Sequence, residues 1–189
     1  VYSFLSSMFE VDGIRYVPVS PSERTCDAID CIYDESAEKI NIGEKVTNKG
    51  ISLTVKQVQP YTCYGNTFIK DVNLGFAGDL GDYAFNGCTS ITSATISNQG
   101  YIGSHAFEGC TGIETVTISN QGNIEEKAFY GCATKNPATF IINNKGSISK
   151  SAFEDCTSIT SATISNNGKI GSSAFEGCTG ITSAAISNQ

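Results

Sequence analysis

The chain has 189 residues, no tryptophan and a formal net charge of −7. Nucleic acid is an unsuitable partner, because its phosphate backbone attracts a basic stripe that this composition lacks. No apolar run approaches the roughly 18 residues that span a bilayer, so the chain is not expected to cross a membrane. The opening residues lack a basic segment followed by an apolar one, and any export signal is expected to have been removed already.

Residues 1–57 are expected to form a small β cap. Two short β-runs flank Asp12-Gly13, which is a strong hairpin signal. A second hairpin is expected around Asn48-Lys49-Gly50, with apolar residues alternating on either side at Ile40, Ile42, Ile51, Leu53 and Val55. Such a cap would cover the edge of a solenoid, whose first coil otherwise exposes its core.

Residues 58–189 are expected to form a solenoid of about six coils, because an Ala-Phe pair followed by a cysteine recurs along them. The phenylalanines are spaced by 22, 22, 24 and 22 residues, at Phe85, Phe107, Phe129, Phe153 and Phe175. Each cysteine follows its phenylalanine by three residues, at Cys88, Cys110, Cys132, Cys156 and Cys178. One slot filled repeatedly by the same residue predicts packing into a shared core.

Each coil is expected to contain one strand, one turn and one short helix or 3₁₀ turn. In the segment SATIS, Ala94 and Ile96 alternate with hydroxyl residues, which is the period of a half-buried strand. Asn98 and its equivalents predict an asparagine ladder after the strands, and Gly100 and its equivalents predict a turn that requires positive φ. The segment SHAFEGC, ending at Cys110, is long enough for one or two helical turns.

Two coils depart from this pattern. In the first, the alignment of Val58 with Ile102 puts Cys63 in the phenylalanine slot, as a core substitute rather than a reactive thiol. The coil that begins at Phe129 contains two extra residues, and Lys135 or Pro137 stands where the other coils have isoleucine.

The cysteines of the repeat are expected to be free and buried. Identical stacked slots hold their Cβ vectors parallel, whereas a disulfide needs two Cβ atoms about 3.8 Å apart and turned toward each other. Zinc is also disfavoured, because the paired spacing of a tetrahedral site is absent. Cys26 and Cys31 lie outside the repeat, and an exported protein would permit either a bridge between them or two free thiols.

The outward strand positions are the candidate binding surface, because a solenoid aligns them into one sheet face. We expect this face to be small, neutral and rich in hydroxyl groups, with Ile141 as an apolar point within it. Its candidate ligand-binding residues are Thr95, Thr117, Thr139, Ile141, Asn143 and Thr163. The alternative is that threonine simply suits strands. An ice-binding face is a further alternative, although rows that mix Ser, Ala, Ile and Thr on a curved surface speak against it.

No catalytic centre is expected. His105 is the only histidine, and its slot holds tyrosine, lysine or serine in other coils, which predicts a solvated surface side chain. Acidic residues such as Glu108 and Glu154 are expected along a solvated edge. At the C-terminal coil, Ile181, Ala184 and Ile186 have no later coil to cover them, so we expect either a longer chain or pairing with a second molecule there.

The order A-F-x-G-C-T-x-I-T-S-x-T-I behind a VDGIRY hairpin resembles the BspA-like leucine-rich repeats of bacterial surface proteins. Isoleucine stands where that family favours leucine, and SNQG replaces its proline-bearing turn. The resemblance implies a right-handed α/β leucine-rich-repeat solenoid, without catalytic centre or cofactor, exported to the cell surface or extracellular space. It also implies binding of a host protein, matrix protein or glycan, or else a structural spacer within a larger surface protein.

Overall fold

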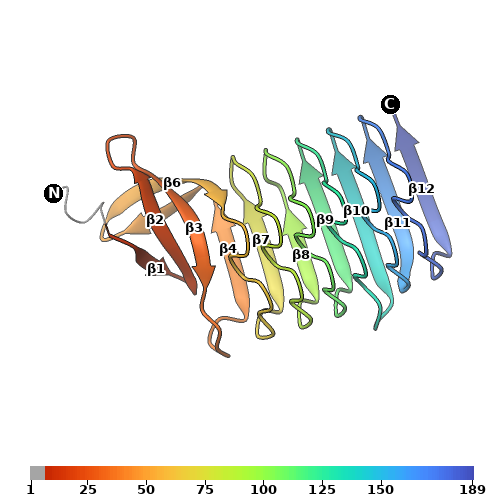
Figure 1. Ribbon diagram of the computed structural model, residues 1–189, viewed down its shortest axis with the longest axis horizontal. Coiled ribbons are helices and arrows are strands. Elements are labelled where there is room, and N and C mark those ends of the chain that lie inside the picture. Colours follow the sequence, from red (N-terminus) through yellow and green to blue (C-terminus); the bar gives the residue numbers. More distant parts are fainter. Residues whose placement is uncertain (1–6) are drawn as a thin grey trace.

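The computed structural model describes residues 7–189, which form a row of parallel strands with a smaller sheet at the N-terminal end (Figure 1). The smaller sheet has the strand order β1-β2-β3-β6-β5, and the larger one runs β4-β7-β8-β9-β10-β11-β12. No helix occurs within residues 7–189. The α/β description is therefore wrong, and the molecule is a β-solenoid.

Two hairpins build the smaller sheet, at the positions expected from their turn residues. Its strands are β1 (Phe9–Val11), β2 (Ile14–Ser20), β3 (Thr25–Cys31), β5 (Lys45–Asn48) and β6 (Ile51–Val58). Asp12 and Gly13 join β1 to β2 with φ of 50° and 78°, and Lys49 and Gly50 join β5 to β6 with φ of 47° and 81°. Two successive positive φ values are what a tight two-residue hairpin turn requires.

The second hairpin includes fewer of the alternating apolar residues than expected. Ile40 and Ile42 lie in β4 (Lys39–Gly43), which pairs in parallel with β7 of the larger sheet and not with β5. Both side chains are buried, with 1% and 0% of their surface exposed. The two sheets are thus interleaved along the chain, because β4 joins the solenoid before β5 and β6 return to the cap.

The larger sheet continues with one strand per turn, and β7 to β12 define five successive turns. The strands are β7 (Asp71–Gly75), β8 (Ser93–Ile96), β9 (Thr115–Asn120), β10 (Ala138–Asn144), β11 (Ile159–Asn166) and β12 (Ser183–Asn188). Equivalent residues pair directly, as in Ala94 with Val116 and Ile96 with Ile118. A second column of parallel bridges links Val58, Leu80, Ile102, Ile124, Ile148 and Ile170. The predicted alignment of Val58 with Ile102 is confirmed.

The two extra residues of the irregular turn are absorbed at the start of β10. Ala138 pairs with Ile159, and the register shifts between Ala138 and Thr139. Lys135 and Pro137 are exposed, so neither replaces the missing isoleucine. Ala138 takes that buried place instead, with 1% of its surface exposed.

The segments expected to form a short helix form isolated hydrogen-bonded bends instead. The N–H of Cys110 donates to the carbonyl of Phe107, but the N–H of Phe107 donates to Ala128 in the next turn at 2.7 Å. His105 and Gly109 also have positive φ, at 58° and 72°. A helix needs consecutive N–H groups bonded within the segment and negative φ throughout. Hydrogen bonding between turns therefore replaces helix formation here.

The recurrent phenylalanines form one continuous stacked column. Adjacent rings from Phe85 to Phe175 are 5.0–5.1 Å apart and within 11° of parallel. Phe140 from β10 packs edge-on against Phe129 and Phe153, at 6.4 and 5.9 Å. Phe85, Phe107, Phe129 and Phe153 are fully buried. The predicted packing of this repeated slot into a shared core is confirmed, and the stacked column is called the spine below.

The asparagine ladder also forms, with Asn120 donating to Asn144 at 3.3 Å and Asn144 donating to Asn166 at 2.9 Å. The reason expected for the glycines beside it is wrong. Gly100 and Gly122 do not have positive φ; a Cβ at Gly122 would lie 2.5 Å from the Gly100 carbonyl oxygen. Only glycine lets neighbouring turns approach so closely at this corner.

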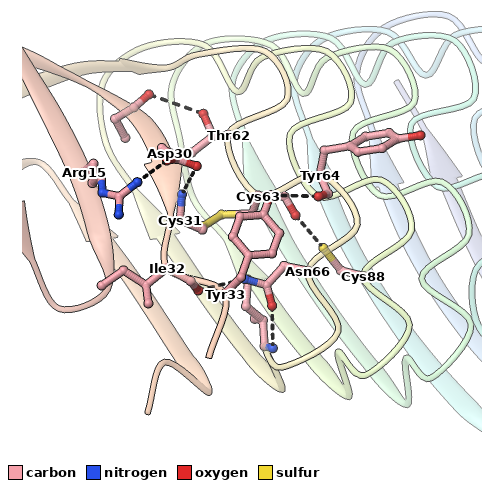
Figure 2. Close-up of a disulfide and its surroundings, with 12 residues drawn as sticks. Arg15, Asp30, Cys31, Ile32, Tyr33, Thr62, Cys63, Tyr64, Asn66 and Cys88 are labelled. Carbon is pink, nitrogen blue, oxygen red and sulfur yellow. Dashed lines mark hydrogen bonds and ion pairs between the residues drawn. A yellow bond between two sulfur atoms is a disulfide. The ribbon is translucent and has the colours of Figure 1, made fainter. Parts of the chain in front are cut away.

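The disulfide joins the cap to the first turn of the solenoid. Cys31 at the end of β3 is bonded to Cys63, with their Cα atoms 5.1 Å apart (Figure 2). Cys26 is a free, buried thiol, so a bridge between Cys26 and Cys31 does not form. Cys63 does occupy the phenylalanine slot, since its N–H donates to Ala84 as that of Phe85 donates to Ala106. It was missed as a disulfide partner because its slot resembled the rest of the repeat.

Candidate binding face

The six candidate residues all lie exposed on the outer surface of the larger sheet. Strand pairing puts four of them in one row across β8 to β11, in the order Thr95, Thr117, Ile141 and Thr163. Thr139 and Asn143 are on the same face of β10, one place to either side of Ile141 along the strand surface. The regular alternation of each strand produces this arrangement, because its inward residues are fixed in the core.

The chemistry of the face over β8 to β11 is uniform and uncharged. Thr139 is flanked by Thr115 and Ser161, and Asn143 is flanked by Ser119 and Ser165. Adjacent strands are about 4.8 Å apart, so hydroxyl and amide groups repeat at that interval along each row. Such a surface can donate and accept hydrogen bonds without the cost of removing charges from water.

Ile141 is the exception on this face. Its side chain is 48% exposed, and its row neighbours are Thr117 and Thr163. An apolar side chain fixed on a strand and surrounded by polar groups is a suitable anchor for a partner, because its burial would remove apolar surface from water.

The N-terminal end of the same face borders an acidic hollow. Asn73 of β7 donates to Asn41 of β4 at 3.2 Å, which continues the outward row to the cap. A hollow of about 600 Å³ lies beside Asn41, lined by residues that include Glu10, Asp12, Glu35 and Glu38. The hollow was not predicted, because it forms only where the β1–β2 turn meets the edge strand β4.

A surface row of aromatic rings was also missed. Tyr61 stacks on Tyr83 at 5.0 Å, and Tyr83 stacks on His105 at 4.7 Å. His105 is not a solvated side chain: its Nδ1 is 2.6 Å from Glu108 Oε2, and 24% of its side chain is exposed. The spacing of these three residues by 22 was the available signal. It was read as a variable surface slot because the later turns hold lysine or serine there.

The cysteine column is built for packing and not for reaction. The thiols donate to carbonyl groups of the preceding turn, as in Cys110 to Phe85 at 3.1 Å and Cys132 to Phe107 at 2.7 Å. Burial raises the pKa of Cys132 and Cys156, which keeps both thiols protonated and weakly nucleophilic. Across residues 7–189, no three side chains of His, Cys, Asp or Glu converge as metal ligands.

Comparison with known families agrees with this repeated geometry. Six copies of the BspA type leucine rich repeat region match residues 78–189. The chain belongs to this family. The resemblance seen in the A-F-x-G-C motif is thus confirmed, and the match begins at the end of the first turn and extends over the last strand. No curated protein sequence matches the chain significantly.

Solved structures of low sequence identity share the fold of this BspA-type protein. A leucine rich cell surface protein from Faecalibacterium prausnitzii A2-165 is 14% identical, with a TM-score of 0.59 over 97% of this chain and 55% of its own. The chain thus spans about half the length of that protein. The leucine rich repeat protein of T. pallidum is 14% identical, with a TM-score of 0.55 over 93% of this chain and 91% of its own.

None of the described residues forms a helix that could cross a membrane.

Proposed function

We propose that this BspA-type chain is a non-catalytic recognition module of the cell surface or extracellular space, which binds a protein or glycan through the outward face of β8 to β11. The observation that carries the proposal is the row Thr95, Thr117, Ile141 and Thr163. It combines one exposed apolar anchor with hydroxyl groups at a fixed spacing on a rigid sheet. Repeat proteins of this kind present extended surfaces for binding.

The disulfide supports an extracytoplasmic location. Cytosolic thiols are kept reduced, whereas disulfides persist in secreted and surface proteins. Cys31 and Cys63 form a bond between two elements of the fold that are 32 residues apart in sequence. The name of the Faecalibacterium protein, which has the same fold, agrees with this location.

Substitution of Ile141 by arginine tests the binding face. Immobilised protein would be used to capture partners from extracellular-matrix and host-surface fractions, and the affinity of each purified partner would then be measured by surface plasmon resonance. We expect Ile141→Arg to weaken binding at least about tenfold, because a charge replaces the apolar anchor that the partner would cover.

The matched control is Gln121→Arg, which adds the same charge at an exposed position just beyond β9. This control should leave affinity unchanged. A partner whose affinity is the same for Ile141→Arg and the native protein would refute this face as the site. Capture of no partner would favour the spacer role, and thermal hysteresis of the purified protein would favour ice binding.

A further inference from the structure

A second surface of the solenoid is aromatic, and it lies on the turns and not on the strands. This group, here called the aromatic surface, consists of Tyr33, Tyr61, Tyr64, Tyr83 and His105. Tyr33, Tyr61 and Tyr64 are 47%, 55% and 49% exposed. Tyrosine exposed in a group is unusual on a surface without a partner, since the ring offers a large apolar area together with a hydroxyl group.

The rings of the aromatic surface are held in place. Tyr61 is stacked on Tyr83 and lies 5.5 Å from Tyr64 in a tilted arrangement. The Tyr33 hydroxyl donates to the Tyr64 carbonyl at 2.8 Å. Figure 2 shows the Tyr33 ring beside the Cys31–Cys63 bond and Tyr64 next to Cys63, and this bond fastens their two segments together. A partner would therefore pay little entropy to order these rings.

The charged groups that act on the rings of the aromatic surface are carboxylates, with Asp30 near Tyr33 and with Glu108 and Asp82 near Tyr83. Residues 71–126 contain seven Asp and Glu residues and no Lys or Arg. Residues 127–189 differ, with five lysines and three carboxylates. Burial and then the nearby groups Tyr61, Glu108 and Asp82 raise the pKa of the Tyr83 hydroxyl, and Glu108 Oε2 also lies 2.6 Å from Nδ1 of His105.

We propose that the aromatic surface binds an extended segment of a cationic polypeptide, with arginine or lysine side chains packed against the tyrosine rings. Ring faces attract cations through their quadrupole, and neighbouring carboxylates strengthen that attraction. The negative charge of residues 71–126 would also steer a basic partner toward this surface. This surface is separate from the neutral sheet face, and its occupant differs in charge.

A peptide of alternating arginine and glycine is a direct probe, with its citrulline counterpart as the uncharged match. Binding can be followed by calorimetry and by the intrinsic fluorescence of tyrosine, since the chain contains no tryptophan. We expect the arginine peptide to bind at low salt and more weakly at high salt. The citrulline peptide should bind at least about fivefold more weakly, because it keeps the shape and loses the cation.

Two variants locate the site. Tyr61→Ser combined with Tyr64→Ser removes two rings and should weaken the arginine peptide at least about fivefold. Tyr130→Ser is the matched control, because Tyr130 occupies the equivalent slot to Tyr64 three turns further on and should leave affinity unchanged. Asp82→Asn is a second test that does not depend on the folding of the double variant. It keeps every ring and the oxygen that accepts from the Ser104 N–H, and it should also weaken binding because it removes a nearby negative charge.

The proposal is overturned if the arginine peptide does not bind at low salt, or if the citrulline peptide binds equally well. It is also overturned if binding survives both the tyrosine pair and Asp82→Asn. Salt-independent binding of a neutral oligosaccharide at the same tyrosines, without binding of the arginine peptide, would assign the surface to glycans instead.

Discussion

At the residue scale, each recurrent side chain satisfies a requirement that the neighbouring turn imposes. Phe129 shows this most fully: its ring lies between Phe107 and Phe153, with Phe140 against its edge. The stack is possible because one slot per turn is filled by the same planar side chain. Removal of one ring therefore affects its own turn and both neighbours.

We expect Phe129→Ala to lower the free energy of unfolding by about 3–5 kcal/mol, because it leaves a cavity in the middle of the spine. Chemical denaturation followed by circular dichroism measures this change. Phe175→Ala is the comparison, since Phe175 is only partly buried and has one stacked neighbour. A loss below about 1 kcal/mol for Phe129→Ala would contradict the role of the ring.

Thiol reactivity is a second expectation for single residues. Burial raises the pKa of Cys88, Cys132 and Cys156, whereas interaction with the neighbouring Cys156 lowers the pKa of the partly exposed Cys178. Alkylation of the folded protein by iodoacetamide, followed by peptide mass spectrometry, should modify Cys178 first. The other three thiols should react only on unfolding. Equal rates for all four would show that the column is open to solvent.

At the scale of the element, the turn is defined by hydrogen bonds to its neighbours and not by its own helical or strand propensity. The segment from Ser104 to Cys110 illustrates this, because backbone donors at Phe107 and Gly109 bond to the next turn. The same close approach makes the corner at Gly122 intolerant of a side chain. Spacing between turns therefore decides local structure here.

Gly122→Ala should lower the free energy of unfolding by about 2 kcal/mol, because its Cβ would lie 2.5 Å from the Gly100 carbonyl and force two turns apart. Gly43→Ala in β4 is the control, since the nearest atom to its Cβ is 4.0 Å away. That change should alter stability by less than about 0.5 kcal/mol. Thermal unfolding of the two variants compares them directly, and equal losses would refute the steric explanation.

At the scale of the whole molecule, stability depends on how the cap is attached to the row of turns. Repeat arrays are held by contacts between neighbours, so an unprotected first turn is a weak point. Here β4 extends the solenoid sheet into the cap, Val58 begins the bridge column, and the disulfide adds a covalent link. The cap and the solenoid are therefore expected to unfold together.

Replacement of both Cys31 and Cys63 by alanine should cost about 3–4 kcal/mol, since the bond closes a loop of 32 residues in the unfolded chain. Denaturation in the presence and absence of dithiothreitol measures the effect. Reductant should lower the midpoint of the native protein and leave that of the double variant unchanged. Peptide mapping should also find Cys26 free; a Cys26–Cys31 peptide would contradict this connectivity.

Much of the architecture is already determined by the sequence. The 22-residue period specifies the spine, the bridge column, the asparagine ladder and the outward row that includes Ile141, because each turn repeats the same local pattern against the same neighbour. Tertiary structure alone decided the Cys31–Cys63 bond, the transfer of β4 to the solenoid sheet, the loss of helix in the turns and the acidic hollow. These features depend on contacts between segments that do not share the repeat, or on how closely successive turns approach. The 22-residue period specifies neither the contacts between non-repeated segments nor the distance between successive turns.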